Sequence, residues 1–320
     1  MNSSSNITLS CIIPVLNEKE NIAPLTAEMV RVVDVQKIEF EIIFVDDGST
    51  DGTYQELSKV RKRYPQRVRI IKFRTNFGKS AAYDAAFKIA RGNIIATLDG
   101  DGQDNPSELD KMILKLGQGY DMVGGWRKNR KDRIIKTLSS KLFNFVTRKF
   151  SSLELQDFNC GMKVYRKSAV ESLRLYGDLH RYIPVLLAAN GYKVTEIEVS
   201  HRKRFSGRSK YGTARFINGF LDLFTVMSIS RYRSRPMHFF GYIGSIFFMT
   251  GFAIGIYLMF VKYFLAQSIG DRPLLLLSVM LMIMGVQITI TGLVGEYIRM
   301  FVSPDRPTYD IESIQGYKDR

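Results

Sequence analysis

Two long stretches without charged side chains constrain the fold of this chain more than any other feature. Residues 237–261 and 273–295 contain no Lys, Arg, Asp or Glu over 25 and 23 positions. A helix of about 20 residues crosses the ~30 Å hydrocarbon layer of a bilayer, so either stretch is long enough. Core helices of a soluble protein are the alternative, but these normally end sooner and show a polar stripe. The pattern therefore predicts two membrane-spanning helices joined by a short connection.

The basic residues beside these stretches predict how the helices are oriented. Arg231, Arg233 and Arg235 directly precede the first stretch, whereas the connection holds Lys262 and Arg272. The larger cluster of positive flanking residues stays on the cytoplasmic side of a membrane. The N-terminus has no signal-peptide pattern. We therefore expect a multi-pass protein with both termini in the cytoplasm and the connection outside.

Residues 213–230 are predicted to form an amphipathic helix at the membrane interface. Apolar residues recur there mostly three or four positions apart, and basic residues border the segment. This pattern is typical of helices that lie in the interface, although a helix of the soluble domain is the alternative. The expected organisation is a cytoplasmic domain at 1–212, an interface helix at 213–235, a transmembrane hairpin at 236–299 and a cytoplasmic tail at 300–320.

The cytoplasmic domain alternates short apolar strands with amphipathic helices. The expected strands are residues 9–15, 41–46, 68–73 and 93–99, and the expected helices are residues 20–35, 50–64 and 79–90. This alternation predicts an α/β domain with a mostly parallel, Rossmann-like sheet covered on both faces. Ligands of such sheets bind beyond the carboxyl ends of the strands.

The charge of the chain is concentrated in two windows. Lys and Arg number 46 against 31 Asp and Glu, which gives a net charge of +15. Residues 121–150 hold nine basic and two acidic side chains, residues 200–236 hold nine basic and one acidic, and the remainder is balanced. Such patches bind nucleic acid, an anionic membrane or a phosphorylated substrate. Cys11 and Cys160 lie in apolar, strand-like surroundings, so buried thiols are predicted and a disulfide framework is excluded.

Acidic residues follow the predicted strands, where a ligand is expected. Asp46 and Asp47 end one strand, and Asp99 and Asp101 follow another with a single Gly between them. Two carboxylates so spaced can converge on a hard cation, so the pattern predicts a site for Mg²⁺ or Mn²⁺. Such an ion can bind phosphate oxygens and stabilise a leaving diphosphate.

Two other motifs do not qualify as phosphate-binding loops. Gly78-Lys79-Ser80 matches the end of a P-loop, but Phe73 stands where the loop requires its first Gly. No G-x-G-x-x-G follows the first strand. Kinase-like and dinucleotide-dependent chemistry are therefore excluded. The three histidines lack a partner at zinc-ligand spacing and are expected to be structural or interfacial.

Five motifs in order carry a resemblance to a known family. They are IPVLNE at 13–18, VDDGSTDGT at 45–53, NFGK at 76–79, LDGDGQ at 98–103 and RFSGRSKY at 204–211. With the two C-terminal spans, the chain resembles the inverting family-2 glycosyltransferases of GT-A fold, of the dolichyl- and polyprenyl-phosphate sugar synthase type. It is most similar to the bacterial undecaprenyl-phosphate glucosyltransferases. The resemblance implies transfer of glucose from UDP-glucose to a polyprenyl phosphate at the cytoplasmic face of a bacterial inner membrane.

The resemblance also implies roles for individual residues. The nucleotide base and ribose would contact Pro14, Glu18, Val45 and Asp47. Asp99 and Asp101 would hold the metal and diphosphate, and Gln103 would lie close to the sugar. The basic side chains expected to contact phosphate are Arg127, Lys141, Arg204 and Lys210. Asp157 occupies the usual place of a catalytic base, where positioning, weak base assistance and a purely structural role all remain open.

The chemistry of the acceptor explains why charge is needed more than a base. A phosphate monoester has its second pKa near ~6, so it is mostly dianionic at neutral pH. The site must bring two anionic substrates together, and positive charge does this. The expected partners are a nucleotide sugar, a polyprenyl phosphate and anionic lipids, with no nucleic acid. Glycines in the spans permit a homo-oligomer without requiring one.

The same sequence leaves three alternative functions to consider. The weakest is an anchored scaffold with a degenerate site, which is hard to reconcile with the intact Asp47, Asp99, Asp101 and Arg204. A nucleic-acid-binding membrane protein would fit the net charge, but no recognised binding module is present. A processive polysaccharide synthase of the same fold would carry a Q-x-x-R-W motif and more spans, and the sequence has neither.

Overall fold

The computed structural model describes residues 8–35, 38–128, 144, 147–148, 151, 153–202, 236–266, 268–270 and 273–302. The chain divides into two compact units, Met1–Val226 and Met227–Arg320. The predicted interface helix at 213–230 and residues 303–320 of the tail lie outside the described residues. The corresponding domain boundaries therefore stay predictions.

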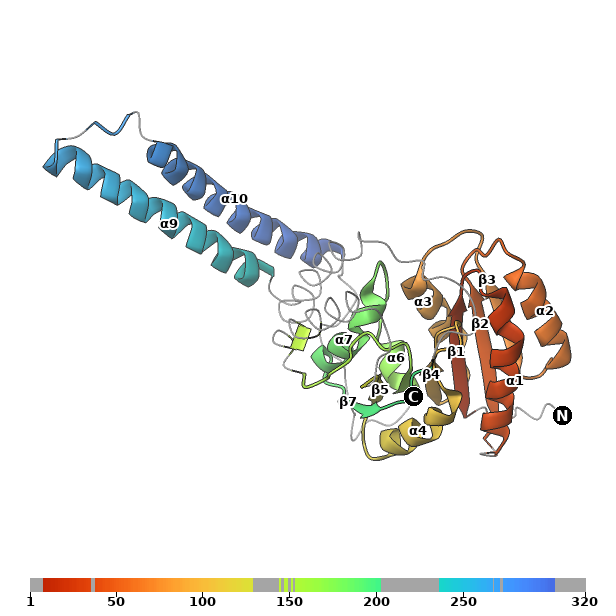
Figure 1. Ribbon diagram of the computed structural model, residues 1–320. Coiled ribbons are helices and arrows are strands. Elements are labelled where there is room, and N and C mark those ends of the chain that lie inside the picture. The colour runs from red at the N-terminus through yellow and green to blue at the C-terminus, as the bar shows by residue number, and fades with distance from the viewer. Residues whose placement is uncertain are drawn as a thin grey trace, which may run out of the picture. The chain divides into compact units, whose positions relative to one another are not determined.

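A mostly parallel sheet forms the centre of the first unit (Figure 1). Its described strands are β1 (Leu9–Val15), β2 (Phe40–Asp46), β3 (Val68–Lys72), β4 (Ile94–Thr97), β5 (Met122–Trp126), β6 (Lys163–Arg166) and β7 (Val194–Glu198). Their order is β3-β2-β1-β4-β6-β5-β7, and β6 runs antiparallel to both of its neighbours. The predicted α/β architecture is confirmed.

The sequence of β2 explains its place inside this sheet. Its run FEIIFVD is buried at every position, as expected for a strand covered on both faces. It pairs in parallel with β1, and the register places Pro14 opposite Val45. The polar residues that follow β1 and β2 therefore emerge at the same edge of the sheet.

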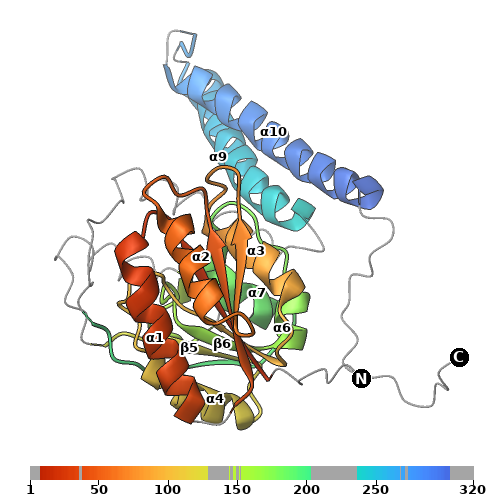
Figure 2. The same cartoon turned by 90° about the vertical axis from the view of Figure 1, so that its right-hand side faces the viewer.

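Helices cover both faces of the sheet (Figure 2). They are α1 (Lys19–Val35), α2 (Thr53–Arg63), α3 (Lys79–Ile89), α4 (Leu109–Gly117), α6 (Lys167–Glu171) and α7 (Ile183–Ala189), with 3-10 turns η1 (Pro106–Glu108) and η2 (Leu179–Tyr182). One hydrophobic core joins apolar residues of α1, α2 and α4 to alternate residues of β1. The helix α3 packs against β1 and β2 from the opposite face.

Two segments differ from the strands expected from sequence. The strand β4 ends at Thr97, before the predicted end at residue 99, because the backbone N–H of Asp99 donates to the Asp104 carboxylate at 2.8 Å. Cys160 lies in the irregular segment before β6 rather than in a strand. Both cysteines are buried and free, so the prediction of buried thiols is confirmed.

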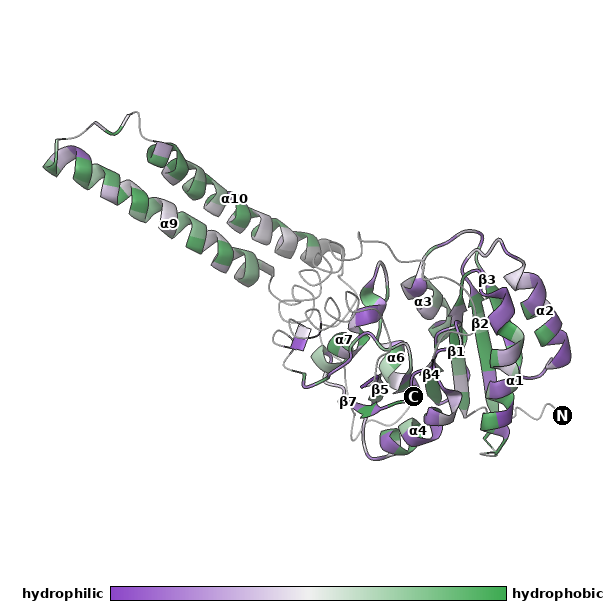
Figure 3. Ribbon diagram, viewed as in Figure 1, coloured by the Kyte–Doolittle hydropathy of each residue, from purple (hydrophilic) through white to green (hydrophobic). Residues whose placement is uncertain are grey.

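The second unit contains two long apolar helices, α9 (Pro236–Phe264) and α10 (Pro273–Val302). The two lie side by side (Figures 1 and 2) and are predominantly apolar along their length (Figure 3). The segments Phe239–Phe264 and Pro273–Gly295 are long and apolar enough to cross a membrane. Glycines allow the close packing: a Cβ at Gly251 would lie 2.6 Å from the carbonyl oxygen of Ser278. The two predicted spans are therefore present as candidate transmembrane helices.

Candidate active site

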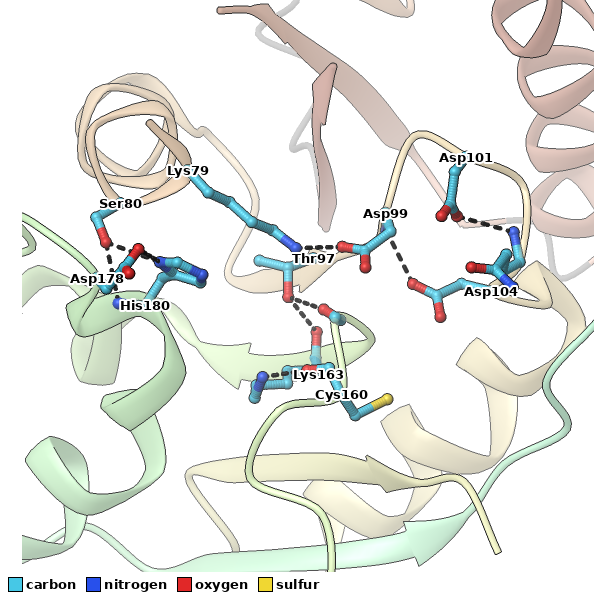
Figure 4. A network of polar contacts seen from close by, with 12 residues as sticks. Lys79, Ser80, Thr97, Asp99, Asp101, Asp104, Cys160, Lys163, Asp178 and His180 are labelled. Carbon is cyan, nitrogen blue, oxygen red and sulfur yellow. Dashed lines mark hydrogen bonds and ion pairs between the residues drawn. The ribbon is translucent and has the colours of Figure 1, made fainter. Parts of the chain in front are cut away.

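The acidic loop after β4 is folded by its own carboxylates (Figure 4). The Asp104 carboxylate accepts the backbone N–H of Asp99 at 2.8 Å, and the Asp101 carboxylate accepts the backbone N–H of Gln103 at 3.1 Å. Burial and the neighbouring charge of Asp99 raise the pKa of Asp104 to about 7. The loop thus concentrates negative charge at the carboxyl end of β4.

A lysine from α3 contacts this loop. The Lys79 ammonium group donates to the Asp99 carboxylate and forms an ion pair with it (Figure 4). Desolvation opposes ionisation of Asp99, but Lys79 more than compensates and holds the pKa of Asp99 at about 2. Asp99 is therefore ionised throughout the physiological range.

Gly161 provides space for Asp99. A Cβ atom at Gly161 would overlap the Asp99 carboxylate, so this position requires glycine for a steric reason. Gly100 is similarly close to β1, since a Cβ there would lie 3.0 Å from the carbonyl oxygen of Pro14. The acidic loop is thus packed tightly between the end of β1 and the segment before β6.

The residues expected at the nucleotide lie at the ends of β1 and β2. The Asp47 backbone N–H donates to the Val15 carbonyl at 2.9 Å, and its carboxylate accepts the N–H groups of Phe77 at 2.7 Å and Gly78 at 3.0 Å. Burial raises the pKa of Asp47 against these hydrogen bonds. Glu18 is fixed through its backbone N–H, which donates to Thr53 at 2.9 Å. The structure therefore brings Pro14, Glu18, Val45 and Asp47 to one edge of the sheet.

Gln103 connects the acidic loop to the segment before the second basic motif. Its side-chain amide donates to the Arg202 carbonyl at 3.3 Å, and its own carbonyl accepts the Arg202 backbone N–H at 3.0 Å. The Arg202 guanidinium donates to Glu28 at 2.7 Å. The segment that leads into residues 204–211 therefore starts beside the acidic loop.

Arg127 and Asp157 form a buried bidentate ion pair. The Arg127 Nε and Nη2 atoms donate to the two Asp157 oxygens at 2.7 and 3.1 Å, and the side chains are 7% and 6% exposed. Asp157 also accepts the backbone N–H of Asn159 at 3.2 Å. Arg127, expected to bind phosphate, and Asp157, expected at the place of a base, thus use much of their hydrogen-bonding capacity on each other. The other predicted phosphate contacts, Lys141, Arg204 and Lys210, lie outside the described residues.

Comparison with known proteins identifies the family. The glycosyl transferase family 2 domain matches residues 10–174, which include β1 to β6 and the acidic loop. This chain is a family 2 glycosyltransferase.

Relatives and structural neighbours agree with this assignment. The enzyme is 36% identical over 315 residues to dodecaprenyl-phosphate galacturonate synthase of Rhizobium johnstonii, covering 97% of this chain and 93% of that protein. It is 31% identical over 317 residues to undecaprenyl-phosphate 4-deoxy-4-formamido-L-arabinose transferase of Aeromonas hydrophila, covering 98% and 96%.

Solved structures share the fold at lower identity. Mannosyl-3-phosphoglycerate synthase from Rubrobacter xylanophilus matches with a TM-score of 0.55 and 15% identity, covering 71% of this chain and 75% of that one. Glucosyl-3-phosphoglycerate synthase from Mycobacterium tuberculosis, in complex with Mn²⁺, UDP-glucose and phosphoglyceric acid, matches with a TM-score of 0.53 and 18% identity, covering 70% and 81%. The expected GT-A fold is therefore shown.

The donor atoms of the acidic loop suit a hard divalent ion. Asp99 and Asp101 offer carboxylate oxygens, which Mg²⁺ and Mn²⁺ prefer. Among the described residues, no group of three His, Cys, Asp or Glu side chains forms a complete metal site. A cation held by two carboxylates retains positions for substrate phosphate and water, which is the usual arrangement for Mg²⁺. The loop thus fits the expected ion.

Lys79 was not predicted as part of this site. Its place at the end of the NFGK motif is a signal that could have indicated it, but the pattern alone does not specify the partner of its ammonium group. Its neighbour Ser80 pairs with His180 Nδ1 at 3.0 Å, and Asp178 lies 3.9 Å from that same nitrogen. Because both groups approach one nitrogen, this cluster does not have the geometry of a catalytic triad. It instead ties α3 to η2.

Proposed function

We propose that this glycosyltransferase transfers a sugar from a nucleotide diphosphate to the phosphate of a membrane polyprenol. The observation that carries the proposal is the extent of the similarity. The two curated relatives named for polyprenyl phosphates align over 97% and 98% of the chain, whereas the structures of mannosyl- and glucosyl-3-phosphoglycerate synthase cover 71% and 70% of it. An acceptor that is part of a membrane lipid accounts for a similarity that extends beyond the catalytic domain, and for the two apolar helices.

The reaction forms one bond and breaks one bond at the anomeric carbon. An acceptor phosphate oxygen attacks that carbon, the bond to the donor diphosphate breaks, and the nucleoside diphosphate leaves with the electron pair. Attack from the opposite side inverts the configuration. Because the acceptor is already mostly dianionic at neutral pH, no strong base is needed. The engagement of Asp157 by Arg127 supports a positioning role for this carboxylate.

Asp99 and Asp101 would hold a Mg²⁺ or Mn²⁺ ion, which supplies positive charge for the departing diphosphate. Pro14, Glu18, Val45 and Asp47 would form the nucleotide side of the pocket, with Gln103 toward the sugar. Lys141, Arg204 and Lys210 would contact phosphate, and Arg127 would orient its neighbours through Asp157. Preorganised charges of this kind are the main means of stabilising a developing anion.

The expected location is a bacterial inner membrane with the first unit in the cytoplasm. The remaining basic side chains of residues 121–150 and 200–236 would face anionic headgroups, where each contributes ~1 kcal/mol. The interface helix at 213–235 would strengthen this attachment. The acceptor phosphate would then be reached at the membrane surface without extraction of the lipid.

A donor screen tests the proposal. Membranes containing the protein should transfer label from one UDP-sugar to undecaprenyl phosphate, and the lipid product should be identified by mass. UDP-glucose is the donor expected from the sequence, and UDP-galacturonic acid is the donor suggested by the name of the Rhizobium johnstonii relative. Transfer should stop in excess chelator and in Asp101→Asn. A polymeric product, or no lipid product with any donor, would contradict the proposal.

A further inference from the structure

In the protein without metal, Lys79 provides the positive charge beside a carboxylate that is expected to bind the metal. It is the first residue of α3, and its ammonium group pairs with Asp99, one of the two expected metal ligands. The two side chains are 26% and 32% exposed, so neither is locked in the core. The Lys79 ammonium also lies 5.6 Å from the centre of the Tyr83 ring.

The backbone around Lys79 is held from both sides. On one side, the Asp47 carboxylate accepts the N–H groups of Phe77 and Gly78 at 2.7 and 3.0 Å. On the other side, Ser80 Oγ lies 3.0 Å from His180 Nδ1 and accepts the His180 backbone N–H at 3.0 Å. The start of α3 is thus fixed, and the side chain of Lys79 extends from it to the Asp99 carboxylate (Figure 4).

The acidic loop needs a positive partner in every state. Asp99, Asp101 and Asp104 lie within six residues, and the Asp104 carboxylate accepts the backbone N–H of Asp99 at 2.8 Å. In addition to burial, the charge of Asp99 raises the pKa of Asp104, because neighbouring carboxylates raise each other's free energy unless a cation compensates them. Lys79 supplies one positive charge. A divalent ion against Asp99 would supply two, and it would repel an ammonium group that already holds the same carboxylate.

We propose that Lys79 is an internal counter-cation that neutralises Asp99 before the metal binds and yields this carboxylate to the metal. The inference rests on the proposed metal site at Asp99 and Asp101. Lys79 competes with the metal when the nucleotide is absent, and the displaced ammonium is available for the donor diphosphate once the nucleotide binds. Metal and nucleotide therefore bind cooperatively, and Lys79 carries part of that coupling.

The test is a Mn²⁺ titration of the full-length protein in detergent, with free Mn²⁺ measured by electron paramagnetic resonance. Lys79→Met keeps the length of the side chain and removes its charge. Without nucleotide, we expect Lys79→Met to bind Mn²⁺ roughly tenfold more tightly than the wild type, a factor equivalent to about 1.4 kcal/mol of lost competition. Saturating UDP should tighten Mn²⁺ binding relative to the protein without nucleotide, and the factor should be smaller in Lys79→Met than in the wild type.

Two variants serve as controls. Lys88→Met removes a lysine from the same helix, where it pairs with Asp84 on the surface, and should leave Mn²⁺ binding unchanged. Lys79→Arg retains the charge and should keep the wild-type affinity, which separates the effect of charge from a disturbed fold. If Lys79→Met does not fold, Lys79→Arg still tests the proposal. Mn²⁺ binding tenfold tighter in Lys79→Arg than in the wild type would overturn it, because the charge is retained.

The outcomes distinguish this inference from the proposed metal site. Asp101→Asn should weaken Mn²⁺ binding in the wild-type background and in Lys79→Met. If it does so while Lys79→Met binds Mn²⁺ no more tightly than the wild type, the role of Lys79 is wrong and the metal site stands. If Asp101→Asn has no effect, the metal site is wrong and the inference fails with it.

Discussion

At the scale of single residues, the Arg127–Asp157 pair illustrates how burial changes the meaning of a charged side chain. Both residues lie at the carboxyl-end edge of the sheet, yet each is less than a tenth exposed. A buried ion pair loses much of its attraction to desolvation, whereas removal of one partner leaves an uncompensated charge. The pair therefore holds the segment before β6 against the end of β5.

Asp157→Asn tests this structural role. We expect it to destabilise the first unit by roughly 3–5 kcal/mol, because Arg127 is left buried without a carboxylate. Thermal unfolding of the purified protein measures the effect. The paired variant Arg127→Met/Asp157→Leu removes both charges and should be more stable than Asp157→Asn. An Asp157→Asn protein with wild-type stability and no transferase activity would instead indicate a base.

Gly161→Ala tests whether space beside Asp99 is required for activity. The added methyl group would overlap the Asp99 carboxylate and displace it. Because a shift of about 1 Å in a reacting group can cost ~100-fold in rate, we expect a loss of about that size in sugar transfer. Gly117→Ala is the matched control, since a Cβ there meets no atom within 4 Å. Equal activity of the two variants would contradict the steric argument.

At the scale of elements, the connection between α3 and η2 gives the first unit a defined pH dependence. Burial, with the nearby charges of Lys79 and Arg181, holds the pKa of His180 well below its ordinary value of 6.5. Below pH 6.5 the unfolded chain binds a proton at this histidine that the folded protein excludes. The contribution of neutral His180 to the free energy of unfolding is thus fully present above the pKa of the unfolded chain and is lost progressively as the pH falls below it.

His180→Gln should reduce that pH dependence. Between pH about 7.5 and about 5.5, we expect the melting temperature to fall less steeply in His180→Gln than in the wild type, because the titrating group is gone. His201→Gln is the matched control, since it removes a histidine and leaves the contact between α3 and η2. If the melting temperature of His180→Gln falls with pH as steeply as that of the wild type, His180 does not contribute to the pH dependence of stability.

The elements near the N-terminus were predictable, whereas the contacts between distant elements were not. Apolar runs bounded by polar turns located β1 to β4, and the motifs after them located Asp47, Asp99 and Asp101 correctly at strand ends. Pairing of Asp99 with Lys79 depends on the path of α3 across the sheet, which no local pattern encodes. The antiparallel insertion of β6 between β4 and β5 is likewise set by packing.

At the scale of the whole molecule, the sequence divides into a polar catalytic unit and an apolar pair of helices. Nearly all of α9 and α10 outside their contact with each other is apolar and exposed, for example Phe264 at 77% and Leu276 at 70%. Exposed apolar surface on this scale is unfavourable in water and favourable in hydrocarbon. The orientation of the hairpin then decides which side of the membrane holds the substrates.

Cysteine labelling tests that orientation with a clean background. The native Cys11 and Cys160 are 0% exposed, and burial raises the pKa of Cys160 to about 12, so neither thiol should react. In intact spheroplasts, a membrane-impermeant maleimide should label Ser268→Cys in the connection and leave Lys62→Cys in the first unit unlabelled. After permeabilisation both should react. The reverse pattern would place the first unit outside the cytoplasm, where nucleotide sugars are not supplied, and would contradict the proposed reaction as well as the orientation.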